Sequence, residues 1–265
     1  MMAIHIFVRM LLLNRREKKG QVFMKQKKNR FGFVMTTVLI TVCLFASCGT
    51  EPQKQAEEEM TDPIEPGISV EMPQEIDSIS LESAFRRRES IRHFANQSIA
   101  QEKIVTLISA VHGEGADVMS SATRPVASAG ATHPIEIYIV TGDVEGLTAG
   151  VYQYDFSADV FITVTEGDIR EKMAQAALGQ SFMANAPATM VIAAEYQRTT
   201  HRYGERGRRF VYMESGGAAQ HIALQAAAFD LGNVIVGAFD DERVQQLLQI
   251  SESPLLLIPV GYRAE

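Results

Sequence analysis

Cysteine and tryptophan are almost absent from this chain, which has two cysteines and no tryptophan among its 265 residues. Two cysteines are too few for a disulfide-stapled scaffold or for a zinc site built from several thiolates. The sequence also lacks an HExxH pair, a GxSxG segment and a P-loop, and its six histidines are scattered. These absences argue against the common zinc hydrolases, serine hydrolases and P-loop nucleotidases, and we expect no metal site.

Charge is unevenly distributed along the chain. Residues 1–30 carry nine basic residues and one acid, residues 49–80 carry nine acids and one lysine, and residues 81–265 carry 22 acids and 15 bases. An acidic body argues against a nucleic-acid partner, because such binding depends on a basic face that neutralises phosphates. Residues 81–265 are numerous enough for one domain that buries roughly 70% of its unfolded surface.

An uncharged apolar run occupies Phe31 to Thr50 and holds both cysteines, Cys43 and Cys48. A short basic region precedes it, which is the pattern of a secretory signal. The small residues before Cys48 resemble a bacterial lipobox, in which the cysteine carries the lipid. We therefore expect residues 1–48 to be an upstream segment plus a lipoprotein-type signal peptide, lipidated at Cys48. The exported protein would then be membrane-anchored at the extracytoplasmic face. An uncleaved anchor helix is the alternative, since ~20 apolar residues span a bilayer.

Residues 49–80 are rich in acids and prolines and show little apolar periodicity. Such a segment buries too little surface to offset its ordering entropy. We therefore expect a disordered acidic tether before a domain at residues 81–265. With Cys43 removed and Cys48 lipidated, that domain would hold no free thiol, which excludes cysteine catalysis.

Helix and strand patterns mix in the domain without strict alternation, which argues for an α+β fold. A capping box at Ser98 and Gln101 predicts the start of a helix that stops at Gly113. The remaining patterns predict helices at 81–88, 168–178, 210–230 and 241–248, and strands at 135–141, 151–154, 160–164, 188–194, 233–236 and 255–260.

A cationic cluster stands out in the acidic domain at Arg86–Arg92. Arg88 and Arg92 are four residues apart, so on a helix they share a face, and Ser90 adds a hydroxyl between them. Two guanidinium groups and a hydroxyl can hold a phosphate, with ~1.5–3 kcal/mol from each charge-assisted hydrogen bond. The alternative is a solvated charged face.

Two further segments are rich in small residues. The small residues within 124–134 would let the backbone approach a flat ligand closely, although an ordinary loop is the favoured interpretation of this segment taken alone. Gly216 and Gly217 lie within an apolar helix at a cost of ~0.5–1 kcal/mol each, which favours either close helix packing or a ligand on the backbone. The basic and aromatic run at 202–210 is interpreted as capping contacts or a patch for an acidic partner.

Taken in order, these segments resemble the nitroreductase-like flavoproteins, and within them the SagB-type dehydrogenase branch, which includes enzymes acting on azoline rings. The matching segments are Arg88-x-Ser90-x-Arg92 and residues 127–134, 150–155, 209–216, 220–226, 237–241 and 257–262. Two positions depart from the family pattern. Glu89 stands where Arg or His is frequent, and Ala131 replaces the Asn of ordinary nitroreductases, as it does in the SagB-type branch.

The resemblance implies an α+β nitroreductase-like fold with a central mixed β-sheet flanked by helices. It also implies non-covalent FMN, and usually a homodimer with the flavin at the subunit interface. By position, it assigns the FMN phosphate to Arg88, Ser90 and Arg92, with Arg263 as a further basic residue after the last strand. It assigns the isoalloxazine ring to Ser128, Ala129 and Gly130, the neighbourhood of its redox-active edge to Gly216 and Gly217, and the facing turn to Gly237 and Ala238.

The expected function is therefore FMN-dependent hydride transfer between an electron donor and a small-molecule substrate, by a lipid-anchored oxidoreductase. Because the flavin carries the chemistry, no catalytic acid or base is assigned. A flavin-binding protein without turnover and a pure interaction lipoprotein are the alternatives.

Overall fold

The computed structural model describes residues 67–69, 79–113, 124–155, 158 and 160–264. Residues 63–265 form one compact unit. The predicted signal peptide, the lipidation site at Cys48 and most of the predicted tether lie outside the described residues, so these remain predictions.

The strands are β1 (Ile68–Ser69), β2 (Ile135–Thr141), β3 (Gly150–Asp155), β4 (Val160–Glu166), β5 (Ala188–Ala194), β6 (Leu231–Asn233) and β7 (Ser253–Tyr262). The helices are α3 (Leu81–Arg87), α4 (Gln101–His112), α5 (Arg170–Ala176), α6 (Phe182–Asn185), α7 (Tyr196–Tyr203), α8 (Arg206–Ala228) and α9 (Asp241–Leu248), with a 3₁₀ turn, η1 (Ala129–Ala131).

The strands form a sheet in the order β1-β4-β3-β2-β5-β7-β6, and every ladder between them is antiparallel. The predicted α+β fold class is confirmed. The expectation of a mixed sheet is corrected in one respect: among the described residues, parallel pairing is limited to the isolated bridges Ser90–Asn233 and Ile99–Val144. Ile68 pairs with Phe161, so the sheet includes two residues of the segment expected to be a tether.

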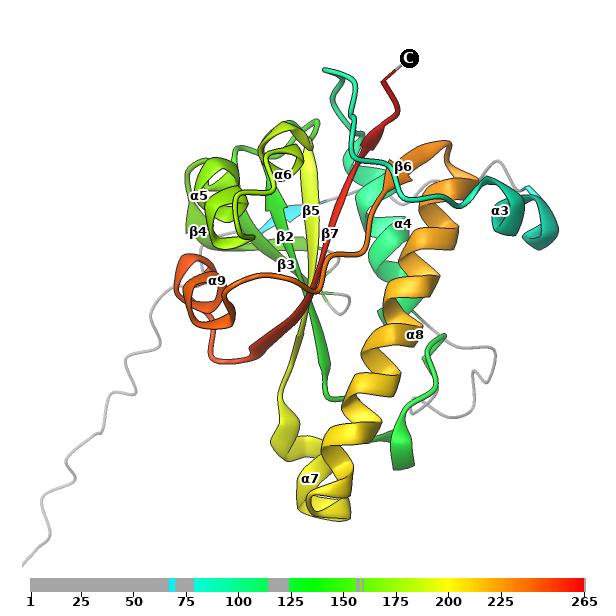
Figure 1. Cartoon of the computed structure of the whole chain (residues 1–265), viewed down its shortest axis with the longest axis vertical. Coiled ribbons are helices and arrows are strands. Elements are labelled where there is room, and N and C mark those ends of the chain that lie inside the picture. Colours follow the sequence, from blue (N-terminus) through cyan, green and yellow to red (C-terminus); the bar gives the residue numbers. More distant parts are fainter. Residues whose placement is uncertain (1–66, 70–78, 114–123, 156–157, 159, 265) are drawn as a thin grey trace, which may run out of the picture. The chain divides into compact units, whose positions relative to one another are not determined.

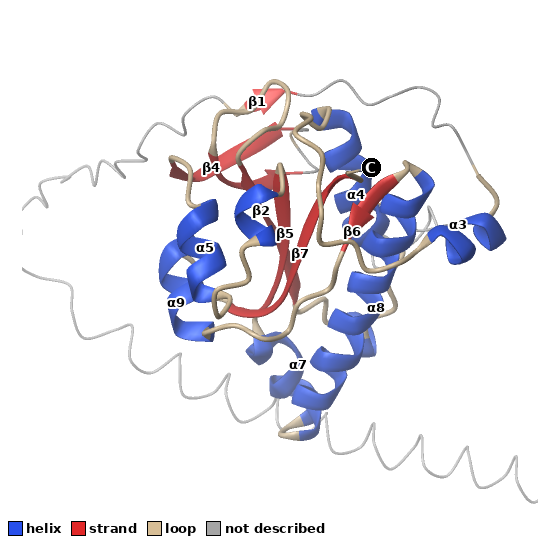
Figure 2. Ribbon diagram, turned by 45° about the horizontal axis from the view of Figure 1, so that its top comes forward, coloured by secondary structure: helices blue, strands red, loops and turns tan. Residues whose placement is uncertain are grey.

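Helices cover both faces of the sheet, with α4 and α8 on one side and α5, α6 and α9 on the other (Figures 1 and 2). Alternation along β2 divides its side chains between two cores, because successive residues of a strand point to opposite faces. Ile137 packs in the core that includes residues of α4 and α8, whereas Tyr138 packs in the core with α5 and α9. This arrangement leaves α8 packed along the sheet.

Helix α8 begins at Arg206, four residues before its predicted start at Phe210. Gly207 permits the tight turn from α7, because a Cβ there would lie 2.9 Å from the Cα of Thr200. The helix packs through small and β-branched side chains such as Ala218 and Ile222, as predicted from its apolar composition. One stripe of it is nevertheless exposed at Tyr212, Met213 and Gly216.

The predicted capping box at Ser98 does not form. Helix α4 has Ala100 at its N-cap position without a side-chain hydrogen bond, and the Ser98 hydroxyl instead donates to the Asp143 carboxylate at 2.7 Å. A contact between residues far apart in sequence has replaced the local one. The predicted cap at Asp240 is confirmed, because its carboxylate accepts from the backbone N–H of Arg243 at the start of α9.

Candidate functional site

The predicted phosphate residues lie in an extended segment that follows α3. The helix ends at Arg87, and Ser90 forms a parallel bridge with Asn233 of β6. The expectation that Arg88 and Arg92 share a helical face is therefore wrong. Arg88, Ser90 and Arg92 instead follow one another along an extended stretch in which Ser90 is paired with β6.

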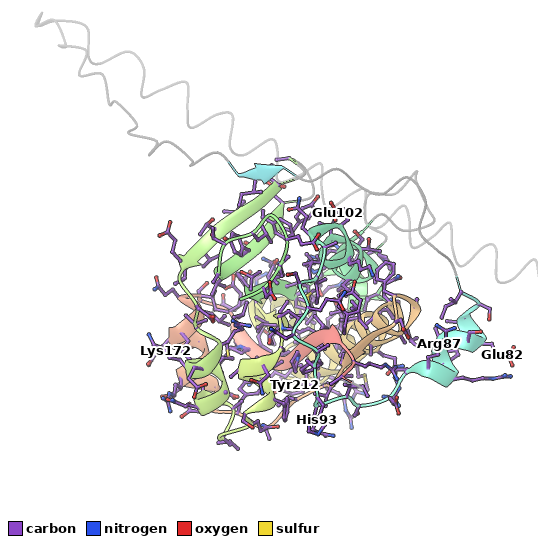
Figure 3. The ribbon with its side chains drawn as sticks, turned by 90° about the horizontal axis from the view of Figure 1, so that it is seen from above. Glu82, Arg87, His93, Glu102, Lys172 and Tyr212 are labelled. Carbon is purple, nitrogen blue, oxygen red and sulfur yellow. The ribbon has the colours of Figure 1, made fainter. Side chains whose placement is uncertain are left out.

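Arg263 reaches this segment from the end of β7. Its backbone pairs with Phe94, its Nη2 donates to the carbonyl of Arg87 at 2.9 Å, and its Nη1 forms an ion pair with Glu89. Figure 3 labels Arg87 on α3 and His93 farther along the same segment. The structure thus brings Arg263 against the segment that contains the predicted N-terminal phosphate ligands, although 174 positions separate Arg263 from Glu89.

Arg88, Ser90, Arg92 and Arg263 form what we call the cationic end, and their side-chain donors suit a phosphate. The Nε of Arg263 is buried and has no partner within the residues that the structure describes. A buried unpaired donor costs about 1–3 kcal/mol. In the same described part of the chain, Arg88 and Arg92 take part in none of the ion pairs, and Arg92 lies 5.9 Å over the ring of Phe182. These donors fit the phosphate of FMN.

The predicted ring-binding residues, Ser128, Ala129 and Gly130, lie in a loop at residues 128–133, the ring loop, whose backbone is unusual. Gly130, Ala131 and His133 have φ of 60°, 52° and 44°. These values lie in the left-handed region, which residues other than glycine adopt only with backbone strain. The Oγ of Ser128 accepts the backbone N–H of His133 at 2.9 Å, which closes the loop. The loop is therefore a defined turn rather than an irregular connection.

Side chains of helix α7 hold this loop in place. The hydroxyls of Thr132 and Thr199 lie 2.8 Å apart, and the guanidinium of Arg202 donates to the carbonyl of Gly130 at 3.0 Å. A side chain at Gly130 would collide with the Tyr203 hydroxyl and the Arg202 guanidinium. The run at 202–210, interpreted from sequence as caps or a partner patch, therefore supports the loop. The composition of the run marked it as unusual but did not indicate this role.

Glu214 of α8 lies beneath the loop and is 8% exposed. Burial raises the pKa of its carboxyl, while hydrogen bonds from the Ser128 hydroxyl and the Ala129 backbone, and the nearby Arg124, lower it. Its Oε2 is buried without a partner among the described residues. A cavity of about 10 Å³ between Glu214, Arg124, His112 and His133 has room for about one water, not for a flavin.

Gly216 and Gly217 differ in their surroundings. A Cβ at Gly216 would meet nothing within 4 Å, whereas one at Gly217 would lie 3.6 Å from Val126, an ordinary contact. Close helix packing therefore does not explain Gly216, which lies on the exposed stripe of α8.

Gly237 and Ala238 lie in the turn between β6 and α9, and both are exposed. The carbonyl of Ala238 accepts from the Gln180 side chain at 2.9 Å. This contact ties the turn to the layer of α5, α6 and α9 rather than to the ring loop.

Helix α8 contacts both the loop of the predicted ring-binding residues and the strand that pairs with the predicted phosphate-binding segment. Glu214 contacts Ser128, and the carbonyl of Ala223 accepts from Asn233, the bridge partner of Ser90. Ala223 follows Glu214 by nine positions, which is about 14 Å along the axis at 1.5 Å per residue. Gly216 and Gly217 fall within this interval.

A larger depression of about 430 Å³ lies elsewhere, between the end of β5 and the start of β7. It is lined by Ala194, Glu195, Tyr196, Gln197, Ser251, Glu252 and Ser253. None of the predicted cofactor residues lines it. Over the described ranges, no cluster of His, Cys, Asp and Glu could hold a metal, and no helix there is long and apolar enough to cross a membrane.

Comparison with known proteins agrees with the fold and with the order of these segments. A protein of Methanocaldococcus jannaschii named as a nitroreductase is 39% identical over 198 residues, covering 75% of this chain and 98% of its own. A nitroreductase structure from Anabaena variabilis matches with a TM-score of 0.61 and 22% identity, over 69% of this chain but only 38% of that one.

The Escherichia coli microcin synthetase McbBCD complex, bound to truncated pro-MccB17, also contains a similar chain. It matches with a TM-score of 0.57 and 21% identity, over 83% of this chain and 85% of that one. At this identity the two structures show a shared fold alone. The model of the nitroreductase family matches residues 85–262, so this chain belongs to the nitroreductase family.

Proposed function

We propose that this protein is an FMN-dependent oxidoreductase that transfers hydride between an electron donor and a small organic substrate. The arrangement along α8 carries the proposal. The cationic segment around Ser90 lies near one end of an interval of about 14 Å, and a small-residue loop lies at the other, with the open position at Gly216 between them. A ligand with a phosphate at one end and a flat ring at the other suits this spacing.

The cationic end would bind and orient the cofactor. Arg88, Ser90, Arg92 and the Nε of Arg263 offer N–H and O–H donors to the phosphate, and guanidinium groups bind phosphates strongly because their donors are charged. Bound FMN would supply the hydride chemistry, and the chain would supply orientation and electrostatics.

The ring end would present backbone to the isoalloxazine. Ser128, Ala129 and Gly130 bear small side chains, and the contacts of Ser128 with Glu214 and of Gly130 with Arg202 fix the turn. A fixed turn costs little further ordering when a ligand binds. Gly216 leaves the neighbouring helix surface open to a planar group.

A homodimer with flavin at the subunit interface is part of the proposal. Tyr212 and Met213 are 51% and 64% exposed on α8 beside Gly216, and Leu81 and Phe85 are 64% and 56% exposed on α3. Exposed large apolar side chains that gather near a predicted ligand site favour an interface there. Gly237 and Ala238, which face the other helical layer, would then serve as the facing turn across the interface.

Two finer assignments rest on sequence. The SagB-type branch is supported by the ordered segments and by Ala131, and the shared fold with the microcin synthetase chain is compatible with it. Export and lipid anchoring at Cys48 are supported by the basic region, the apolar run and the small residues before that cysteine.

The visible spectrum of the purified protein, before and after addition of FMN, tests the proposal. We expect a yellow protein whose absorption is bleached by dithionite and by a physiological hydride donor. A protein that stays colourless after incubation with FMN would refute flavin binding. A yellow protein that only dithionite reduces would favour the alternative, a flavin-binding module without turnover.

A further inference from the structure

The most unusual feature of the cationic end is a carboxylate inside it. Glu89 stands between Arg88 and Ser90, and its side chain forms an ion pair with Nη1 of Arg263. The side chains of Glu89 and Arg263 are 60% and 29% exposed, so the pair lies at the surface, within reach of a dissolved anion.

The hydrogen bonds of Arg263 show which of its donors are already used. A guanidinium group has five N–H donors in a planar fork. Glu89 takes one on Nη1, the carbonyl of Arg87 takes one on Nη2, and the Nε is left buried without a partner among the residues described. Glu89 therefore satisfies the same guanidinium that the proposed FMN phosphate would contact.

The negative charge of Glu89, like its ion pair with Arg263, opposes phosphate binding at this site. A phosphate held by Arg88, Ser90 and Arg263 would lie close to this carboxylate, and like charges at short range repel. The other acid near this segment, Glu82, is bound to Arg86 one helical turn away on α3. Glu82 contacts none of the proposed phosphate ligands.

We propose that Glu89 is an internal counter-anion of Arg263 that competes with the phosphate of the ligand. It sets the affinity of the site and reduces the preference for phosphorylated over unphosphorylated flavin. The inference deepens the proposed function and rests on it where flavin is concerned. Its core, competition between Glu89 and an anion at Arg263, applies equally to inorganic phosphate.

Titration of the full-length protein with FMN, riboflavin and inorganic phosphate tests this proposal, with the Glu89→Gln variant compared against the wild type. Gln keeps the size of the side chain and removes its charge. We expect the Kd for FMN and for inorganic phosphate to fall about fivefold, the ratio expected when an exposed ion pair worth about 1 kcal/mol no longer competes. The Kd for riboflavin should not change. Flavin fluorescence reports the first two ligands, and calorimetry reports phosphate.

Two further variants separate the effect of the Glu89 contact from that of net charge. Glu82→Gln removes the same charge from α3, and it should leave all three affinities unchanged. Glu89→Ala removes the hydrogen bond as well as the charge, and it should tighten binding at least as much as Glu89→Gln.

Unchanged or weaker binding of both FMN and phosphate in the two Glu89 variants would overturn the proposal, because Glu89 would then position Arg263 rather than compete for it. An equal gain in Glu82→Gln would overturn it too, since only long-range charge would be at work. If no variant binds flavin but Glu89→Gln binds phosphate more tightly, the proposed function fails and the competition stands.

Discussion

The guanidinium of Arg202 donates a 3.0 Å hydrogen bond to the carbonyl of Gly130, and the Tyr203 hydroxyl lies where a Cβ at Gly130 would project. Helix α7 therefore fixes the proposed ring loop at a residue whose φ is 60°. A left-handed backbone and the close side chains of Arg202 and Tyr203 both favour glycine at this position.

Substitution of Gly130 by Ala should destabilise the protein by about 2–4 kcal/mol, because backbone strain and a steric conflict add. Gly179 provides a control without those contacts, since its φ is 78° and a Cβ there would meet nothing within 4 Å. Gly179→Ala should cost only the strain of the positive-φ backbone, about 1 kcal/mol. Urea denaturation measures both variants, and equal losses would show that the contacts of Arg202 and Tyr203 do not constrain the loop.

Substitution of Gly216 by Ala should separate stability from flavin binding. Ala in a helix is favoured over Gly by about 0.5–1 kcal/mol, and the site has open space, so the melting temperature should rise. If the flavin lies against this position, the same methyl group should weaken FMN binding, as measured by fluorescence titration. A variant that is more stable and binds FMN normally would remove Gly216 from the site.

Substitution of Arg88 by Ala should lower FMN occupancy. The loss of one charge-assisted contact, worth about 1.5–3 kcal/mol, predicts at least a tenfold rise in Kd. Arg86→Ala is the control, because Arg86 is exposed on α3 and bound to Glu82. The flavin-to-protein ratio after gel filtration reports the effect, and equal ratios in the two variants would place the phosphate elsewhere.

His112 should make stability depend on pH. Burial, together with Arg124, lowers its pKa from 6.5 to about 4. Because the unfolded chain takes up the proton first, unfolding becomes easier as the pH falls from about 6.5 towards 4, by up to about 3 kcal/mol. Glu214 has the opposite effect on stability. Its pKa is raised in the folded protein, so its contribution to the free energy of unfolding falls as the pH rises. The two effects must therefore be separated by mutation.

The His112→Gln variant should show a smaller loss of unfolding free energy between pH 7 and pH 5 than the wild type. His201→Gln, at an exposed position on α7, should behave as the wild type does. Parallel pH dependences in the wild type and His112→Gln would contradict the assignment.

Local pattern was sufficient for most of the fold but not for the contacts that shape the site. The alternation of Ile135, Ile137 and Ile139 predicted β2 with its observed bounds, because these three side chains share the strand face that packs in the core with α4 and α8. Ser98 carried an equally good local signal, yet its hydroxyl binds Asp143, a residue that only the folded chain brings near. Local propensity fails where a distant partner competes for the same group.

The same reason explains what the sequence did not reveal at the candidate site. The spacing of Arg88 and Arg92 predicts one helical face, but the pairing of Ser90 with Asn233 makes the segment extended. Glu214 gave no signal, because a glutamate in a helix is ordinary until the fold buries it under the Ser128 loop. The ion pair between Glu89 and Arg263 joins opposite ends of the domain sequence.

The central claim is that a phosphate-bearing flavin binds with its phosphate at Arg88, Ser90, Arg92 and Arg263. The most direct measurement is the ratio of the Kd values for riboflavin and FMN, in the wild type and in Arg92→Ala. We predict that the wild type binds FMN at least tenfold more tightly than riboflavin, and that Arg92→Ala removes most of this difference while leaving riboflavin binding unchanged. Equal affinity of the wild type for the two flavins, or binding of neither, would contradict the claim.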